Sequence, residues 1–343
     1  MRTTEALHLL RKVIPAREPV MLMGAPGLGK SALVSQAASA AGYGCRILNP
    51  ALLDPTDLGG VPMLSPGAPP RIVRALDDVL LSIVEARDPL VLFLDEMGQA
   101  SPSMQAACAP IVLDRRIGGM PLPDHVSVIC ASNRRADRAG AGGIVSHMVS
   151  RMMVVSVEAT LADWLDWALP AGVLPEVTGF LRFRPALLHQ WDATTIARAA
   201  AGEPYPCPRS WERASRVLGL SLSPDVERHA LMGCVGEGAG REFEAYLAQS
   251  RDLPDVDQLL AQPDQITWDE EPSRCYALAC AIAYRANTVP ERVVQAAHGA
   301  AAHGAGEFAA LILRDAMSRH LDILLHPAFR ALRGTPLGKL LNL

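Results

Sequence analysis

The chain has 343 residues, of which 50% are hydrophobic and 20% are charged. This composition excludes a disordered chain and predicts about two globular domains, each with a sizeable core. The formal net charge of −4 argues against a nucleic-acid-binding protein, because such proteins usually carry a basic excess.

The first half of the sequence alternates between strand and helix patterns. Residues 19–34 predict a strand, a glycine loop and a helix. Four later segments predict strands: 44–49, 90–95, 126–133 and 151–157. Helix patterns cover 71–88 and 101–113, residues 50–70 predict an irregular loop or insert, and the Gly-Gly pair within 115–122 predicts a hairpin. This alternation predicts an α/β fold with a parallel sheet and helices on both faces.

After Glu158 the strand patterns disappear, and helix patterns separated by Pro and Gly continue to the last residues. They cover 160–170, 175–190, 208–219, 224–249 and, as several Ala-rich helices, 273–325. We therefore expect three parts: a first domain at 1–157, a helical domain at 158–250 and a helical extension at 251–343.

The segment GAPGLGKS fits the phosphate-binding pattern G-x-x-x-x-G-K-[ST] between a strand and a helix. In this pattern the loop N–H groups surround a phosphate chain, Lys30 reaches the β- and γ-phosphates, and the Ser31 hydroxyl binds Mg²⁺. The residues expected to contact the nucleotide are Gly24, Ala25, Pro26, Gly27, Leu28, Gly29, Lys30 and Ser31. A second Gly-Lys pair, in GTPLGKLL at 334–341, has a shorter spacing, Leu in place of Ser and no strand before it, so we expect no nucleotide there.

The run VLFLDEM at 91–97 ends a buried strand pattern with two acidic residues. Asp95 is suited to hold Mg²⁺ through its water shell, and Glu96 to orient or deprotonate an attacking water. Two solvated acids at a strand end would be the ordinary explanation of such a pair. Because they follow a phosphate loop, we expect them to act in nucleotide hydrolysis.

These motifs resemble those of the AAA+ ATPases and, among them, the MoxR-type family. Asn133 at the end of VSVICASN is similar to the sensor-1 residue, and Arg151 in HMVSRMMVV to the arginine before the last core strand. Arg209 in CPRSWERAS resembles the sensor-2 arginine of the lid. The segments DPTDLGG at 54–60 and RIGGMPLPDHV at 116–126 resemble an insert and a hairpin of the MoxR-type branch.

The resemblance implies an AAA+ P-loop αβα sandwich, then an all-α lid and an α-helical C-terminal region. It implies ATP as substrate, Mg²⁺ held by Ser31 and Asp95, and a further nucleotide contact from Arg209. The implied catalytic residues are Lys30, Glu96, Asn133 and Arg151. An arginine that reaches a neighbour's γ-phosphate implies a homo-oligomeric ring, a hexamer by resemblance, and Arg134, Arg135 and Arg138 stay open as alternatives to Arg151.

The MoxR-type resemblance also implies a chaperone-like remodeller that activates or assembles a partner protein, in some cases one with a von Willebrand A domain. Residues 50–89 contain no Phe, Tyr or Trp, which argues against polypeptide threading, since threading unfoldases use an aromatic pore loop. Two alternatives stay open: a nucleic-acid-associated motor or loader, and a nucleotide-dependent assembly switch with little turnover. The seven cysteines are scattered and no apolar run approaches the ~20 residues of a membrane span, so we expect a reduced, cytoplasmic protein.

Overall fold

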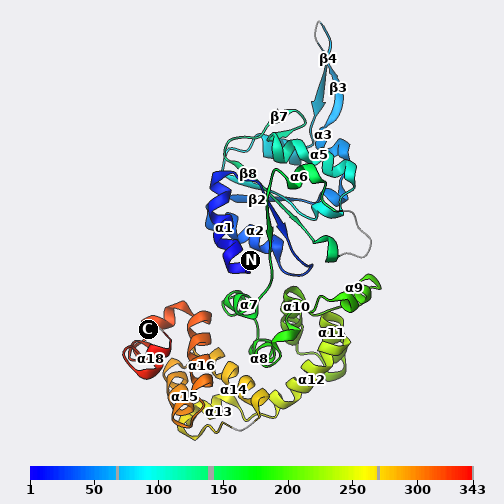
Figure 1. Ribbon diagram of the computed structural model, residues 1–343. Helices are drawn as coiled ribbons and strands as arrows, with labels where there is room; N and C mark the ends of the chain where they lie inside the picture. The colour runs from blue at the N-terminus through cyan, green and yellow to red at the C-terminus, as the bar shows by residue number, and fades with distance from the viewer. Residues whose placement is uncertain (67–68, 138–142, 269–270, 342–343) are drawn as a thin grey trace. The chain divides into compact units, whose positions relative to one another are not determined.

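The structure of the protein, a computed structural model, describes residues 1–66, 69–137, 143–268 and 271–341. Contacts between Cα atoms divide the chain into two compact units, Met1–Thr160 and Leu161–Leu343. The first unit is a sheet flanked by helices, and the described part of the second unit is helical (Figure 1). Within the described ranges, no helix is both long and apolar enough to cross a lipid bilayer. The three-part division at residues 157 and 250 stays a prediction.

The first unit is built on a five-stranded sheet in which all neighbouring strands are parallel. In spatial order the strands are β2 (Gly44–Leu48), β5 (Leu90–Leu94), β8 (Val126–Ser132), β1 (Val20–Met23) and β9 (Met153–Ser156). Each lies within a segment in which the sequence predicts a strand, so the predicted parallel sheet is confirmed. The helices of this unit are α1 (Thr3–Ala16), α2 (Lys30–Ala40), α3 (Pro55–Gly59), α4 (Asp78–Val84), α5 (Pro102–Leu113) and α6 (Ser146–Val149).

Helices cover both faces of the sheet, because alternate side chains of its strands point in opposite directions. Val20 and Leu22 of β1 belong to the core formed with α1 and α2, whereas Met21 belongs to the core formed with α4 and α5. β5 repeats the pattern, with Phe93 on the first face and Leu92 on the second. Strands that are apolar on both faces are typical of a parallel sheet between two helical layers. The predicted αβα sandwich is therefore confirmed.

The helix predicted over residues 71–88 is wrong in its first part. Arg71–Ala75 forms β4, which pairs antiparallel with β3 (Val61–Ser65), and the helix in this region is α4 alone. The irregular loop predicted over 50–70 consequently contains α3 and one strand of a hairpin. Figure 1 shows the hairpin β3–β4 projecting from the rest of the first unit.

Local chemistry explains why the helix starts late. Ile72 and Val73 are β-branched residues that favour a paired strand. Asp77 then caps the helix, since its side chain accepts a hydrogen bond from the backbone N–H of Leu80 at 2.7 Å. The apolar residues across 71–83 recur at helical spacing, but they belong to two elements, the strand β4 and the helix α4. A second hairpin, β6 (Arg116–Ile117) with β7 (Met120–Pro121), turns at the Gly-Gly pair as predicted.

The second unit is an array of helices, most of which begin with proline at their first position, where its missing N–H costs nothing. Its helices are α7 (Leu161–Ala168), α8 (Pro175–Phe183), α9 (Ala193–Ala200), α10 (Pro208–Leu218), α11 (Pro224–Val235), α12 (Glu237–Arg251), α13 (Val256–Ala261), α14 (Pro272–Tyr284), α15 (Pro290–Ala302), α16 (Gly306–Arg319), α17 (Pro327–Arg330) and α18 (Pro336–Leu340). The single helix predicted over 224–249 is wrong. Gly236, at φ 87°, separates α11 from α12.

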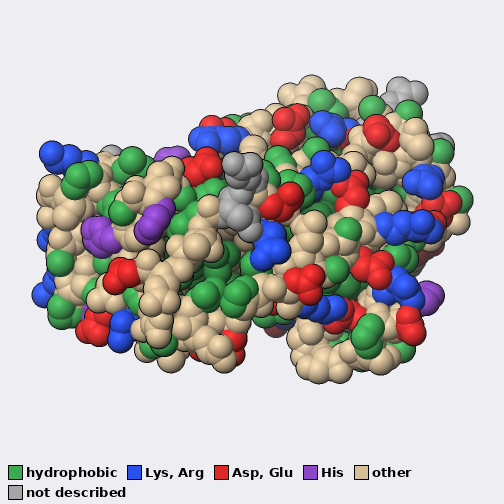
Figure 2. All heavy atoms as spheres, turned by 90° about the horizontal axis from the view of Figure 1, so that it is seen from below, with side chains coloured by type: hydrophobic (Ala, Val, Ile, Leu, Met, Phe, Trp, Pro, Cys, Tyr) green, Lys and Arg blue, Asp and Glu red, His purple; other side chains and the backbone are tan. Residues whose placement is uncertain are grey.

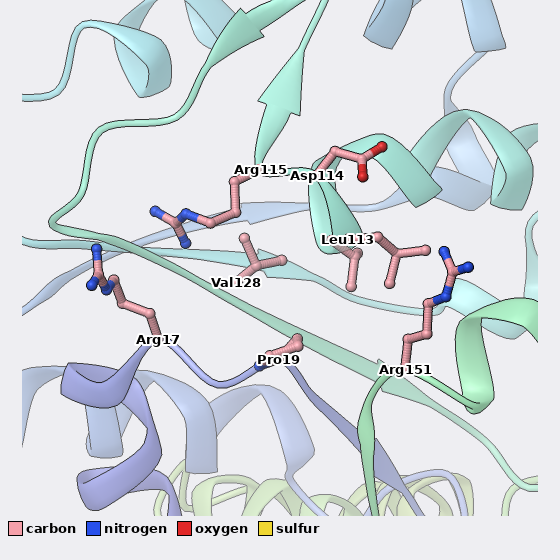
Figure 3. Close-up of a pocket in the computed structure, with 8 residues that line it drawn as sticks. Arg17, Pro19, Leu113, Asp114, Arg115, Val128 and Arg151 are labelled. Atoms are coloured by element: carbon pink, nitrogen blue, oxygen red, sulfur yellow. The ribbon is translucent and has the colours of Figure 1, made fainter.

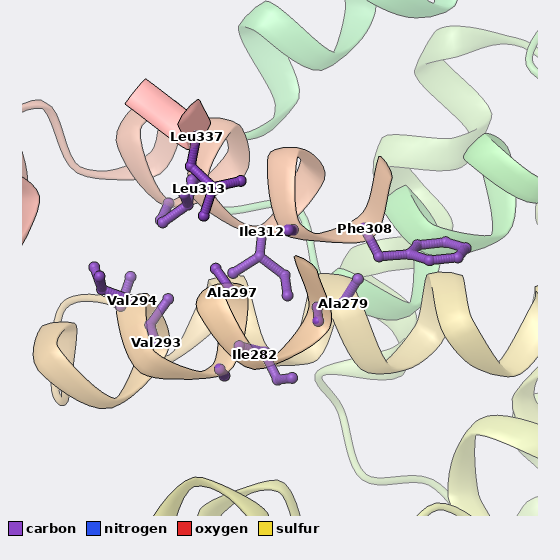
Figure 4. Close-up of a cluster of buried hydrophobic side chains, with 14 of the residues drawn as sticks. Ala279, Ile282, Val293, Val294, Ala297, Phe308, Ile312, Leu313 and Leu337 are labelled. Atoms are coloured by element: carbon purple, nitrogen blue, oxygen red, sulfur yellow. The ribbon is translucent and has the colours of Figure 1, made fainter. Parts of the chain in front are cut away.

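Two hydrophobic clusters hold the second unit together. One surrounds Phe180, whose ring centroid lies 4.9 Å from that of Phe243 and 5.4 Å from that of Trp211. The other joins the Ala-rich helices α14, α15 and α16 around Ile282 and Ile312 (Figure 4). Alanines at these contacts let the helices approach closely, so small side chains build a continuous core.

Trp211 offers a direct test of the first cluster. Its side chain is fully buried, and its indole Nε1 donates a hydrogen bond to the Leu187 carbonyl at 2.7 Å. Trp211→Phe leaves that carbonyl unpaired and should lower the free energy of unfolding by about 1–3 kcal/mol. Trp211→Ala also leaves a cavity and should cost about 3–5 kcal/mol. Urea denaturation followed by circular dichroism measures both variants, and equal losses in the two would contradict this description.

Candidate functional site

Apart from Arg151, the predicted site residues of the first unit whose positions are given below gather at the carboxyl edge of the sheet. Gly24 follows β1, Asp95 follows β5 and Asn133 follows β8, and these strands are neighbours in the order β5-β8-β1. Parallel strands bring their carboxyl ends to one edge, so residues far apart in the sequence become adjacent. Ligands of open α/β sheets bind at this edge.

The loop from Gly24 to Gly29 has the features that phosphate binding requires. Gly29 adopts φ 87°, a conformation that other residues rarely take. A Cβ atom on Gly24 would lie only 2.8 Å from the Val157 carbonyl oxygen, so this position has room for glycine alone. α2 begins at Lys30, directly after the loop, and its unpaired N–H groups and positive dipole end therefore belong to the same site.

Lys30 links the loop to the end of β8. Its half-buried ammonium donates hydrogen bonds to the carbonyl oxygens of Gly24, at 2.9 Å, and Ala25, at 3.0 Å, and to Asn133 Oδ1, at 2.8 Å. These three acceptors are neutral, and together they hold the ammonium in place beside the loop. The structure thus brings together two of the residues that the sequence predicts to be catalytic.

Ser31 and Asp95 form a second link, between α2 and the end of β5. The Ser31 hydroxyl donates to Asp95 Oδ2 at 2.5 Å. A hydroxyl and a carboxylate oxygen side by side are hard ligands of the kind that Mg²⁺ prefers. These two residues therefore fit the metal that the sequence predicts here.

Glu96 lies directly after Asp95 in a strained backbone conformation. Its φ is 59°, in the left-handed region, which costs a residue other than glycine roughly 1–2 kcal/mol. Its backbone N–H donates to Asp95 Oδ1 at 2.9 Å, and its side chain is half-buried. Strain of this kind is concentrated at functional sites, and here it turns the chain at the predicted metal ligand.

Arg151 lies at the opposite edge of the sheet. It comes just before β9, whose first residue Met153 pairs with Val20 at the start of β1. The four residues of β1 separate the two edges by ~13 Å. The Arg151 side chain is exposed and has no hydrogen-bond or ion-pair partner among the described residues. Within one chain, Arg151 and the phosphate loop are therefore far apart.

The alternative arginines differ from Arg151 in their surroundings. Arg134 Nε donates to Asp137 Oδ2 at 2.8 Å, and Arg134 Nη1 lies 3.8 Å from Glu158 Oε1. These carboxylates raise the pKa of Arg134, chiefly through the hydrogen bond to Asp137, and engage its charge within its own unit. Arg138 and the side chain of Arg135 lie outside the described residues.

Arg209, the predicted lid arginine, lies in the second unit. It is the second residue of α10, and its side chain is exposed. The buried residues around it, Pro208 and Ser210, fix this first turn of the helix, with the Cys207 N–H donating to Ser210 Oγ at 2.8 Å. Its contact with a nucleotide stays a prediction.

Sequence reasoning missed Gln105, a buried residue of α5 that connects this helix to the chain leading to Arg151. Its amide nitrogen donates to the carbonyls of Ala100 and Gly143, each at 3.1 Å, and its oxygen accepts from the Val145 N–H at 2.9 Å. A glutamine inside a predicted helix carries no signal for such a role. Only the folded structure shows that the Gln105 amide makes these hydrogen bonds inside the protein.

The order β2-β5-β8-β1-β9, with the glycine loop after β1 and a helical region after the last strand, agrees with the architecture that the sequence resemblance implies. The chain therefore has an αβα sandwich followed by a helical region. No protein-family model matches the chain.

Individual relatives are distant. Over 168 residues the chain is 29% identical to the midasin of Giardia intestinalis, a match that covers 47% of this chain. It covers only 3% of that protein. Among solved structures, NtrX from Brucella abortus in complex with ADP matches 96% of this chain and 68% of its own, with 15% identity and a TM-score of 0.40. A Thermotoga maritima RuvB mutant matches 88% of this chain and 81% of its own, with 14% identity and a TM-score of 0.37.

Proposed function

We propose that this protein is an ATP-hydrolysing AAA+ remodeller, similar to the MoxR-type family, that activates or assembles a partner protein. The observation that carries the proposal is the double link at the carboxyl edge of the sheet. Lys30 is hydrogen-bonded to Asn133, and Ser31 to Asp95, so four predicted residues from three elements form one site. Such a constellation suits the phosphates and metal of ATP.

In this site the loop N–H groups and the N-terminus of α2 bind the phosphate chain, and Lys30 exchanges its carbonyl partners for the β- and γ-phosphates. Ser31 and Asp95 hold Mg²⁺, which when bound neutralises charge on the phosphate oxygens. Glu96 accepts a proton from the attacking water as the water oxygen bonds to the γ-phosphorus and the bond to the ADP oxygen breaks. Asn133 positions that water or the γ-phosphate.

Two further arginines are proposed to complete the site. Arg209 is proposed as a further nucleotide contact. Arg151 contributes from a second copy of the chain, since its position at the amino edge separates it from its own loop. A contact between opposite edges of identical chains is heterologous, and such contacts form a ring when the rotation between copies closes. We therefore propose a ring, a hexamer by family resemblance, with one nucleotide at each contact.

Replacement of Glu96 separates hydrolysis from binding. Glu96→Gln keeps the size of the side chain but cannot accept the proton, so phosphate release should fall about 10²-fold or more while ATP affinity stays within about twofold. Glu85→Gln, an exposed acid at the end of α4, is the matched control and should keep full turnover. Unchanged remodelling by Glu96→Gln would favour the alternative of an assembly switch with little turnover.

The hairpin β3–β4 supports a protein partner. It exposes five aliphatic side chains, at Val61, Met63, Leu64, Ile72 and Val73. Leu64 is 71% and Ile72 74% exposed, and Arg71 and Arg74 lie on the same strand pair. Aliphatic residues exposed together mark contact surfaces for proteins. We propose that this insert contacts the partner, for which a von Willebrand A domain is the leading candidate.

A trap experiment tests the partner. Purified Glu96→Gln protein with ATP should retain the partner, whereas Lys30→Ala protein should release it, and the retained proteins are identified by mass spectrometry. The same trap carrying Leu64→Ser and Ile72→Ser should lose it. Retention of a protein without a von Willebrand A domain would overturn that part of the proposal.

A nucleic-acid motor is the second candidate. It predicts salt-sensitive binding and stimulation of ATP hydrolysis by DNA or RNA. Basic and acidic side chains are interspersed on the face drawn in Figure 2, where no continuous basic stripe is visible. Stimulation of turnover by polynucleotide, combined with an empty protein trap, would favour this candidate over the remodeller.

A further inference from the structure

Arg151 shares a cavity with two other arginines at the amino edge of the sheet. The cavity has a volume of about 240 Å³ and is lined by Arg17, Pro19, Val112, Leu113, Asp114, Arg115, Val128 and Arg151. In Figure 3, Arg17 and Arg115 lie on one side of it and Arg151 on the other. Sequence reasoning identified Arg151 alone, because Arg17 ends α1 and Arg115 follows α5, far away in the chain.

Arg115 is fixed in the cavity wall by backbone oxygens. Its Nη2 donates to the carbonyls of Pro123 and Val126, each at 2.8 Å, and its own backbone adopts a left-handed φ of 53°. Arg17, also left-handed at φ 62°, donates to the Asp124 carboxylate at 2.8 Å. Two residues with left-handed backbones thus hold their guanidinium groups at this cavity, together with Arg151.

The cavity carries an excess of positive charge. Burial and the neighbouring Arg17 cation lower the pKa of the Arg115 guanidinium. The lining contains three arginines and one acid, the exposed Asp114. The carboxylate of Asp124, which is outside the lining, is bound to Arg17. Arg151 has no polar partner among the described residues. An anion entering the cavity would therefore meet a preformed basic wall and one arginine available to bind it.

We propose that this arginine cavity as a whole, rather than Arg151 alone, is the part of the nucleotide site that one copy of the chain supplies to the next. Arg151 contacts the γ-phosphate of the neighbouring copy, and Arg17 and Arg115 are positioning residues that shape the wall and strengthen its positive field. The proposal rests on the proposed function. Its support is the placement of cations at one edge of the sheet and of the phosphate loop at the other.

Complementation between variants tests this division. Arg115→Gln and Arg17→Gln should each lower kcat about 10- to 100-fold, since misplacement of a catalytic group has effects of this size, with little change in the KM for ATP. Mixing either variant with Lys30→Ala protein, which has an intact cavity but no working loop, should restore turnover. Arg116→Gln, an exposed neighbour outside the cavity, is the matched control and should keep full activity.

Several results would overturn the proposal. Full activity of both cavity variants would show that Arg151 acts alone. If the cavity variants lose activity and mixing with Lys30→Ala protein does not restore it, these arginines act within their own chain. Arg115→Lys keeps the charge and should retain more activity than Arg115→Gln. If either Arg115 variant is insoluble, the mixture of Arg17→Gln with Lys30→Ala protein tests the proposal. An inactive wild-type protein would instead contradict the proposed function.

Discussion

Lys30→Ala should weaken ATP binding about 10²-fold or more, because it removes charge-assisted hydrogen bonds worth about 1.5–3 kcal/mol each. In the structure the ammonium sits among Gly24, Ala25 and Asn133, at the meeting point of the loop and β8. Alanine also leaves Asn133 without this donor. Titration with a fluorescent ATP analogue in the presence of Mg²⁺ measures the loss.

The chain contains its own control for this experiment. Lys339 also follows a glycine, but Gly338 lies inside the short helix α18 and its N–H donates to Thr335 Oγ1 at 3.0 Å. Lys339 is exposed, and Lys339→Ala should bind the analogue like the wild type. Equal affinity of the two alanine variants would contradict the assignment of the phosphate loop.

Arg151→Ala should leave ATP binding unchanged and lower the rate of hydrolysis about 10³-fold, the typical effect of losing a trans arginine. The reason is positional: Arg151 lies ~13 Å or more from its own phosphate loop, and its guanidinium has no partner among the described residues. Phosphate release and nucleotide titration, measured together, separate the two effects.

Arg134→Ala is the informative companion variant. Arg134 is engaged by Asp137 and Glu158 in its own unit, so its loss should change turnover only a few-fold, as for an ion pair of modest worth. A large loss in Arg134→Ala together with an active Arg151→Ala protein would transfer the trans role to Arg134.

The sequence was sufficient to predict the sheet and its carboxyl edge. Val20–Met23, Leu90–Leu94 and Val126–Ser132 are apolar runs whose strand character does not depend on distant contacts. Lys30 and Ser31 belong to a local motif, and Asp95 directly follows a strand. Once these strands are parallel and adjacent, their end residues must meet, and this is why the predicted links could be expected before the fold was known.

Other features depend on tertiary contacts that local patterns do not contain. Apolar residues from Ile72 to Ile83 recur at helical spacing, although the helix begins only after its capping residue Asp77. The residues before Asp77 form a strand because β4 pairs with β3. Arg17 and Arg115 come from separate helix ends, so their common cavity appears only when the sheet is assembled. Gln105 similarly finds its partners in a segment far along the chain.

The central claim is that each nucleotide site is shared between two copies of the chain. The most direct measurement is ATP hydrolysis by an equal mixture of Lys30→Ala and Arg151→Ala proteins, each of which should be nearly inactive alone. With random assembly into rings, about one contact in four joins an intact loop to an intact arginine, so the mixture should recover up to about a quarter of wild-type turnover. An inactive mixture of two proteins that fold and assemble, or a fully active Arg151→Ala protein, would contradict the claim.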